Sequence, residues 1–289
     1  MLYTIIILGS FILSLVLVPA AKFLSARLGA VDVPQDVKIH KTAVSRLGGP
    51  AIVIAFALPL LFFAGTRVYA FAAILACALG LVDDIKNIPP QAKLTGEIIL
   101  AVILFSLGFA LEFNPLSLSL MITILWLVGI SNAVNLIDGL DGLAAGTAAI
   151  SAAFFAVIAY MVGDNTILIV SLALIGALVG FLRYNFHPAS IFMGDSGSLS
   201  IGFIFGIIGV SLADKVGYVI PLIILALPIL DTLYAVIRRG INRKPIFRAD
   251  LGHIYNTLMT RFGHTEAVFI CYLAAAMSGL LGLAVFLVV

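Results

Sequence analysis

The residues of this sequence best suited to chemistry are carboxylates placed where apolar segments end. Asp83 and Asp84 are adjacent and directly follow the apolar run 76–82. Charged side chains at the edge of a bilayer are costly to keep, and two neighbouring carboxylates repel each other. We therefore expect this pair to attract a cation. A simple helix stop at the membrane surface is the alternative interpretation.

A second group of polar residues recurs every three positions, at Asn132, Asn135, Asp138 and Asp141. In a helix this spacing turns by about 60° per step, which would spread the last three over roughly 120° of one face. Amide and carboxylate oxygens are the ligands that Mg²⁺ prefers, usually together with substrate phosphates. The pattern therefore predicts Mg²⁺, with Mn²⁺ as the alternative ion, and a phosphate ligand. An Asp/Gly turn between two spans is the competing interpretation.

Two further segments could bind phosphate. The segment Phe192–Leu199 is rich in Gly and Ser, and a helix beginning there would offer backbone N–H groups to an anion. Asp195 within it is either a metal ligand or an N-cap. The basic segment 238–253 can clamp a diphosphate or a lipid phosphate, or can form a belt against anionic headgroups.

The composition indicates that a membrane surrounds these groups. Of 289 residues, 63% are hydrophobic and only 10% are charged, and the mean hydropathy is +1.22. The net charge of +2 gives no reason to expect a nucleic-acid partner. Cys77 and Cys271 lie in apolar stretches without a pairing pattern, so neither a disulfide nor a thiolate metal site is expected.

We expect an all-α, polytopic membrane protein with a single transmembrane domain over residues 1–289 and about ten transmembrane helices, because a span needs about 20 mostly apolar residues. The expected spans are Tyr3–Ala21, Gly48–Ala64, Val68–Val82, Leu94–Leu111, Leu116–Val134, Leu143–Val162, Thr166–Leu182, Leu199–Leu212, Gly217–Val236 and Ala267–Val288.

The basic residues predict the orientation of these spans. Fourteen of the sixteen Lys and Arg fall on one side, and only Arg67 and Lys215 fall on the other. The positive-inside rule makes the first side cytoplasmic and places both termini outside. The three carboxylate groups then share the cytoplasmic face, where a soluble ligand and a lipid headgroup can meet.

In their order, these motifs resemble the polyprenyl-phosphate N-acetylhexosamine-1-phosphate transferases of the WecA/MraY type, in glycosyltransferase family 4. The resemblance rests on the segments His40–Gly49, Asp83–Asp84 with Lys93, Asn135–Gly142 and Met193–Leu199. It implies Mg²⁺ dependence, a UDP-sugar donor, an undecaprenyl-phosphate or other polyprenyl-phosphate acceptor, and release of UMP. It also implies a plasma-membrane enzyme of cell-wall, peptidoglycan or lipopolysaccharide synthesis, with a homodimer as one option.

The resemblance also implies roles for single residues. Asp195 and Asn135 would hold the metal, Asp83 and Asp84 would lie near the acceptor phosphate, and Asp138 and Asp141 would shape the metal and nucleotide site. His253 joins these four aspartates as a catalytic candidate. Substrate contacts are expected from Lys38, His40, Arg46, Lys93, Asn132, Asn135, Arg238 and Arg243.

One segment departs from the family pattern. Where many relatives read H-x-H-H, this chain reads His253-Ile-Tyr255-Asn256. The change affects the choice of sugar nucleotide more than the reaction class. We expect His264 to be a surface residue and not a substitute for the missing histidines.

The mechanism and two rival functions stay open at this point. The acceptor is a phosphate monoester with a second pKa near 6, so direct attack on the β-phosphorus needs no strong base; a covalent Asp intermediate is the competing scheme. A Mg²⁺-dependent membrane prenyltransferase is the rival enzyme. A proton-coupled transporter is the rival of another class, with Asp231 as its relay candidate, although we expect Asp231 to pair with Arg238.

Overall fold

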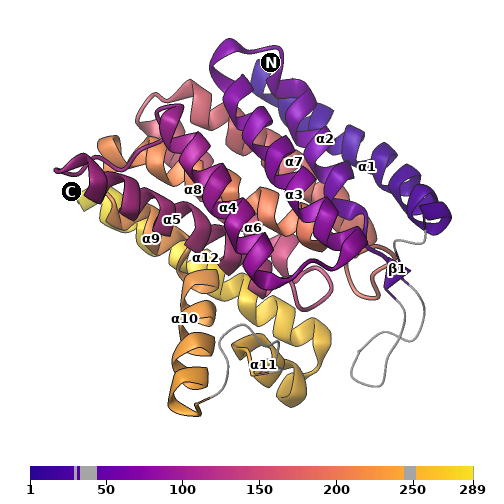
Figure 1. Cartoon of the computed structure of the whole chain (residues 1–289). Coiled ribbons are helices and arrows are strands. Elements are labelled where there is room, and N and C mark those ends of the chain that lie inside the picture. Colours follow the sequence, from indigo (N-terminus) through magenta and orange to yellow (C-terminus); the bar gives the residue numbers. More distant parts are fainter. Residues whose placement is uncertain (29–30, 33–43, 244–251, 289) are drawn as a thin grey trace.

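In the computed structural model the chain is a bundle of helices with one short pair of strands at one end (Figure 1). The structure describes residues 1–28, 31–32, 44–243 and 252–288, so the expected contacts of Lys38 and His40 lie outside it. The elements are α1 (Leu2–Leu28), β1 (Val31–Asp32), β2 (Val44–Ser45), α2 (Gly48–Leu60), the 3₁₀ turn η1 (Ala64–Thr66), α3 (Arg67–Lys86), α4 (Pro90–Ser106), α5 (Leu116–Ile137), α6 (Leu143–Met161), α7 (Asn165–Asn185), α8 (Gly194–Val216), α9 (Val219–Ile224), α10 (Ala226–Ile241), α11 (Ile254–Phe262) and α12 (His264–Val288).

Helix α8 is the centre of the bundle. In its most apolar stretch, 94% of the residues are buried, and it packs against α3 on one side and α5 on the other. Glycines bring the helices close together: a Cβ on Gly202 would lie 2.4 Å from Cα of Ser131 in α5. Small residues at helix contacts are typical of bundles in membranes, where close packing holds the helices together.

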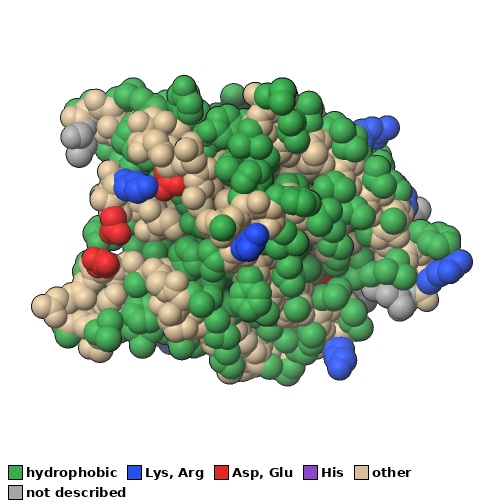
Figure 2. Space-filling model, turned by 90° about the horizontal axis from the view of Figure 1, so that it is seen from above, with side chains coloured by type: hydrophobic (Ala, Val, Ile, Leu, Met, Phe, Trp, Pro, Cys, Tyr) green, Lys and Arg blue, Asp and Glu red, His purple; other side chains and the backbone are tan. Residues whose placement is uncertain are grey.

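The periphery of the bundle is apolar and exposed. In the described part of the chain, seven helices are long and apolar enough to cross a membrane, and α2 is a shorter apolar helix. In α1 and α12 only 22% and 28% of the most apolar stretch is buried. Figure 2 shows hydrophobic side chains over much of the face seen from above, with few charges. These observations support a polytopic membrane protein.

Three expected spans differ in length or continuity from the structure. The third was expected to be short, but α3 has 20 residues. The eighth was expected to be short, but α8 extends it at both ends to 23 residues. The ninth, Gly217–Val236, is not one helix, because α9 ends at Ile224 and α10 begins at Ala226. Pro228 has no N–H to donate to the carbonyl four residues earlier, so a continuous helix loses a hydrogen bond at this point.

The break sets α10 apart from the other helices. Its buried residues are Pro228, Asp231, Ala235 and Arg239, which lie on one face, whereas its remaining apolar side chains are largely exposed. Figure 1 shows α10 extending from the bundle next to α11. An apolar helix face in this position is suited to contact lipid.

The start of α2 is fastened to the loop before α8. Phe192 N donates to the carbonyl of Ser45 at 2.8 Å, and Gly49 N donates to the carbonyl of Met193 at 2.8 Å. A Cβ on Gly49 would lie 2.2 Å from the backbone nitrogen of Gly197, so the backbones of α2 and α8 touch here and only glycine fits. The segment that contains Arg46 is thereby held beside the start of α8.

Candidate active site

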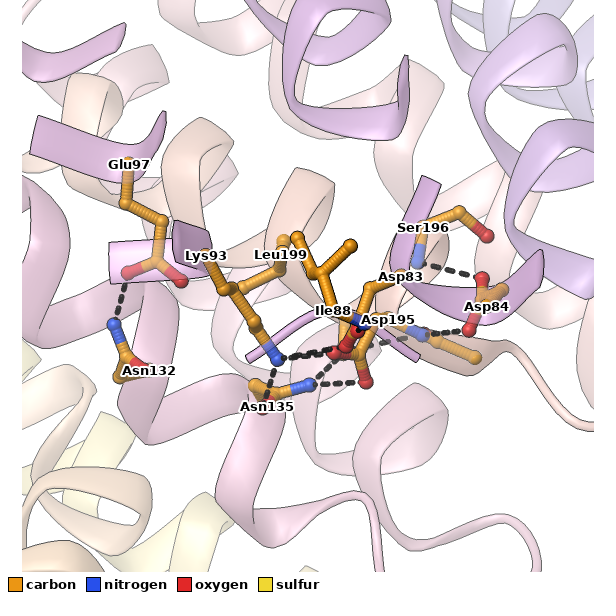
Figure 3. A network of polar contacts seen from close by, with 12 residues as sticks. Asp83, Asp84, Ile88, Lys93, Glu97, Asn132, Asn135, Asp195, Ser196 and Leu199 are labelled. Carbon is orange, nitrogen blue, oxygen red and sulfur yellow. Dashed lines mark hydrogen bonds and ion pairs between the residues drawn. The ribbon is translucent and has the colours of Figure 1, made fainter. Parts of the chain in front are cut away.

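The ends of α3 and α5 and the beginnings of α4 and α8 bring six of the fourteen expected site residues together (Figure 3). Asp84 binds the first turn of α8 with both oxygens: Oδ1 accepts from the amide of Asp195 at 2.8 Å and Oδ2 from the amide of Ser196 at 3.0 Å. These amides have no partner within their own helix, and a negative charge at a helix N-terminus is favourable. Asp84 therefore positions Asp195.

Two glycines allow this contact between α3 and α8. A Cβ on Gly80 would lie 2.4 Å from the carbonyl carbon of Asp195, so the two backbones touch one turn before Asp84. Gly194 has a φ of +66°, and a Cβ there would lie 2.7 Å from both carboxylate oxygens of Asp84. The left-handed φ and the close carboxylate both favour glycine at this position.

Asp83 points in another direction from its neighbour. Its Oδ1 accepts from the amide of Ile88 at 2.8 Å, and its Oδ2 lies 3.7 Å from Nζ of Lys93. The adjacent aspartates thus do different things: Asp84 is occupied by the backbone of α8, and Asp83 faces a cation.

Lys93 lies at the centre of an oxygen cluster formed by Asp83, Asn135 and Asp195. Besides facing Asp83, its Nζ forms an ion pair with Asp195 and donates to Oδ1 of Asn135 at 3.2 Å. Asn135 in turn donates from Nδ2 to Oδ1 of Asp195 at 3.0 Å and to Oγ of Ser198 at 2.8 Å. Three helices, α3, α5 and α8, each contribute one side chain to this cluster.

The oxygen cluster fits a divalent cation. Its members offer only carboxylate and amide oxygens, the ligands that Mg²⁺ and Mn²⁺ take. They already converge on a positive charge, the ammonium of Lys93, which shows that this position is suited to a cation. Asp83 and Asp195 together carry more negative charge than Lys93 balances.

Asp138 lies beside this cluster at the end of α5. The helix ends at Ile137, so the expected helical fan of polar residues does not form, and Asp138 is the C-cap. Burial, together with the neighbouring carboxylates of Asp195, Asp84 and Asp141, raises the pKa of Asp138 to about 8. Asp138 is thus surrounded by negative charge in the absence of a metal.

Asp141 lies with two histidines. Its Oδ2 is 2.8 Å from Nδ1 of His187 and accepts from the amide of Ala189 at 3.0 Å. Its backbone amide donates to Nε2 of His264 at 3.2 Å. His264, which was expected to be a surface residue, is half-buried and contacts Asp141. His187 had not been singled out, and a lone histidine in the loop before α8 gave no signal of this contact.

A second pair missed by sequence reasoning is Glu97 with Asn132. The Glu97 side chain is fully buried in α4 and accepts a hydrogen bond from Nδ2 of Asn132. Its other oxygen, Oε1, has no hydrogen-bond partner in the described part of the chain. Glu97 lies one helical turn after Lys93 in an apolar stretch, and this spacing, which puts both side chains on one face of the helix, could have indicated that Glu97 belongs near the site. Asn132, expected to bind substrate, here faces Glu97.

The helices α10 and α11 form a region, here called the α10–α11 region, that contacts the end of α5. Nδ1 of His253 lies 2.7 Å from Oδ2 of Asp231, and the amide of Ile254 donates to Oδ1 at 2.8 Å. In the described part of the chain Asp231 thus pairs with His253, where pairing with Arg238 was expected. The hydroxyl of Tyr255 donates to the carbonyl of Leu136 at 3.2 Å.

Three arginines that were expected to bind substrate do not belong to the oxygen cluster. The Arg238 guanidinium packs on Gly252, next to His253, since a Cβ there would lie 2.0 Å from Cζ. Arg243 is exposed after the end of α10. Arg46 is half-buried between β2 and α2.

Comparison of the sequence with known proteins identifies the family of this chain. The model of glycosyl transferase family 4 matches residues 66–213, which include the whole oxygen cluster. A probable undecaprenyl-phosphate N-acetylglucosaminyl 1-phosphate transferase of Bacillus subtilis (strain 168) is 39% identical over 90% of this chain and 78% of its own length. The chain belongs to glycosyl transferase family 4.

Other members of glycosyl transferase family 4 support the assignment. A decaprenyl-phosphate N-acetylglucosaminephosphotransferase of Mycolicibacterium smegmatis is 30% identical over 87% of this chain and 74% of its own length. A phospho-N-acetylmuramoyl-pentapeptide-transferase of Staphylococcus epidermidis is 30% identical over 98% of both chains. The WecA/MraY resemblance is thereby confirmed. The α10–α11 region lies outside the residues that the family model matches.

Proposed function

We propose that this protein transfers an N-acetylhexosamine 1-phosphate from a UDP-sugar to undecaprenyl phosphate or another polyprenyl phosphate, giving a polyprenyl-diphosphate-sugar and UMP. The observation that carries the proposal is the convergence of Asp83, Asn135 and Asp195 on one point at the end of the bundle, which the ammonium of Lys93 approaches. The relatives support it, since their names state a sugar phosphate transferred to a polyprenyl phosphate.

Asp195 and Asn135, with Asp83, would hold Mg²⁺ or Mn²⁺. When bound, the ion neutralises charge on the donor diphosphate and so favours transfer. Asp84 supports this by fixing the first turn of α8, and Ser198 supports it by holding the amide of Asn135. Lys93 adds a fixed positive charge beside the phosphates.

The acceptor phosphate attacks the β-phosphorus of the donor. A new P–O bond forms from an acceptor oxygen, the bond to the bridging oxygen of the diphosphate breaks, and that oxygen leaves with UMP. Because the acceptor is largely dianionic at neutral pH, no strong base is required. Asp83 is the member of the aspartate pair suited to orient the acceptor, since Asp84 is occupied by two amides of α8.

The reaction would take place at the cytoplasmic face of the plasma membrane, in cell-wall or surface-glycan synthesis. The sidedness rests on the fourteen Lys and Arg that gather on one side of the expected spans. A site at headgroup depth meets both a soluble nucleotide sugar and a lipid phosphate.

The test uses the full chain in detergent with Mg²⁺, a polyprenyl phosphate and a panel of radiolabelled UDP-sugars. We expect UMP release and transfer of label into butanol-extractable lipid with one or a few donors. Absence of both products across the panel, from protein that is folded by circular dichroism, would refute the proposal. Incorporation of label from a prenyl diphosphate would support the prenyltransferase alternative.

A further inference from the structure

A histidine cluster lies outside the oxygen cluster and has no role in the transfer described above. It consists of Asp141 in the turn after α5, His187 in the loop between α7 and α8, and His264 at the first position of α12. One ligand atom from each residue lies within 4.8 Å of the ligand atoms of the other two. Three segments that are far apart in the sequence thus present two imidazoles and a carboxylate to one point.

At least one of the two imidazoles is neutral, which is the state that binds metals. Their rings stack with centroids 4.0 Å apart and planes 22° apart, an arrangement that two positively charged rings would resist. His264 Nε2 accepts a hydrogen bond from the backbone amide of Asp141, so this nitrogen carries a lone pair and no proton. Neutral imidazole is the form that ligates metals.

The protein leaves one atom of this cluster unsatisfied. His264 Nδ1 is buried and has no hydrogen-bond partner in the described part of the chain. Buried polar atoms without a partner are rare in folded proteins. In the neutral ring Nδ1 carries the proton, so the lone pair open to a metal is that of Nε2, which a metal would take in place of the Asp141 amide. The contacts of the His264 ring with protein atoms are therefore incomplete.

We propose that Asp141, His187 and His264 bind a zinc ion. Two imidazole nitrogens and one carboxylate form the three-ligand set that zinc takes when a fourth position stays open to water. Mg²⁺ prefers oxygen ligands and retains several waters, so this cluster and the oxygen cluster select different ions. To bind zinc through Nδ1, the neutral His187 ring carries its one proton on Nε2, and this partly exposed ring can reach that tautomer by proton exchange with water.

Zinc at this position would fasten three segments together. It would join the beginning of α12 to the turn after α5 and to the loop that leads into α8. A bound ion stabilises the folded state by mass action, so the melting temperature should rise with zinc concentration. The inference does not depend on the transfer reaction.

The experiment is isothermal titration of the full-length protein, stripped with a chelator, with ZnCl₂ in detergent and excess Mg²⁺. The excess Mg²⁺ occupies oxygen-ligand sites. We expect one equivalent of zinc to bind to the wild type, and at least tenfold weaker binding to His187→Gln and Asp141→Asn. The matched control is His253→Gln, since His253 is engaged with Asp231 and is not in the cluster; its zinc binding should equal that of the wild type.

Co²⁺ absorption provides a second measurement that distinguishes ligand loss from misfolding. Co²⁺ bound through two imidazoles should give ligand-field bands in the wild type that disappear in folded His264→Gln, with folding checked by gel filtration. Failure of the wild type to bind zinc in excess Mg²⁺ would overturn the proposal. Equal zinc affinity of the wild type and of folded variants in the cluster would overturn it as well.

Discussion

The oxygen cluster and the α10–α11 region approach the end of α5 in different ways. The oxygen cluster is built from the ends of helices that pack backbone to backbone, as at Gly80 and Gly202, and it lies within the family match. The α10–α11 region lies outside that match, has an exposed apolar face, and carries the altered histidine motif. We infer that the transfer chemistry depends on the oxygen cluster and that the choice of substrate depends on the α10–α11 region.

The largest expected effect is that of removing Asp195 from the oxygen cluster. Asp195→Ala should lower UMP release by at least about a thousandfold, because a charge-stabilising group is lost from the metal site. The matched control is Asp164→Asn, an aspartate that caps α7 and binds Lys215 away from the site. Steady-state assays should find this control within about twofold of the wild type. Near-wild-type activity of Asp195→Ala would contradict the metal assignment.

The next effect separates the two adjacent aspartates. Asp83→Ala should lower the rate by about a hundredfold and should cost less stability than Asp84→Ala, since Asp83 accepts one backbone amide, that of Ile88, and Asp84 accepts two. Asp84→Ala should lower both, with a loss of about 1–2 kcal/mol of unfolding free energy from the uncapped start of α8. Steady-state rates and chemical denaturation, measured on both variants, test whether the loss of rate and the loss of stability separate in this way. Equal stability of the two variants would argue against a capping role for Asp84.

A smaller effect concerns pH. Because the pKa of Asp138 is raised to about 8 in the folded protein without metal, its ionised form destabilises the fold, increasingly as pH rises from about 4 to 8. Metal-free Asp138→Asn should therefore melt a few degrees above the wild type at pH 8, with the difference vanishing near pH 4. Thermal melts in a chelator measure this. A constant difference across that range would exclude the titration of Asp138 as its cause.

The smallest effect lies in the α10–α11 region. Tyr255→His with Asn256→His restores the family motif, and we expect a change of a few-fold in donor KM and in preference among UDP-sugars, with kcat kept. The reason is that Tyr255 contacts the end of α5 and not the oxygen cluster. The matched control is Tyr234→Ala, an exposed residue of α10. A large fall in kcat would mean that this region takes part in the chemistry.

The sequence predicted the helical class and the gathering of Asp83, Asn135 and Asp195, because apolar runs define helices and their ends define where polar residues meet. It could not separate Asp83 from Asp84, since only the packing of α8 decides which carboxylate is occupied. The spacing of Asp141 suggested a helix, but α5 ends at Ile137.

Pairings between distant segments were equally out of reach of sequence reasoning. Glu97 with Asn132 and Asp231 with His253 are each joined by tertiary contacts between residues more than 20 positions apart. Pro228 was a local signal for the break between α9 and α10. A proline is also tolerated in the first turn of a helix, so its presence alone did not predict where the helix would break.

The central claim is that side chains from α3, α5 and α8 hold one divalent cation. The direct measurement is an electron paramagnetic resonance titration of Mn²⁺ into the full chain with UDP-sugar present. The account predicts one bound Mn²⁺ in the wild type, and loss of this binding in Asp195→Ala and Asn135→Ala. Unchanged Mn²⁺ binding in both folded variants would contradict it.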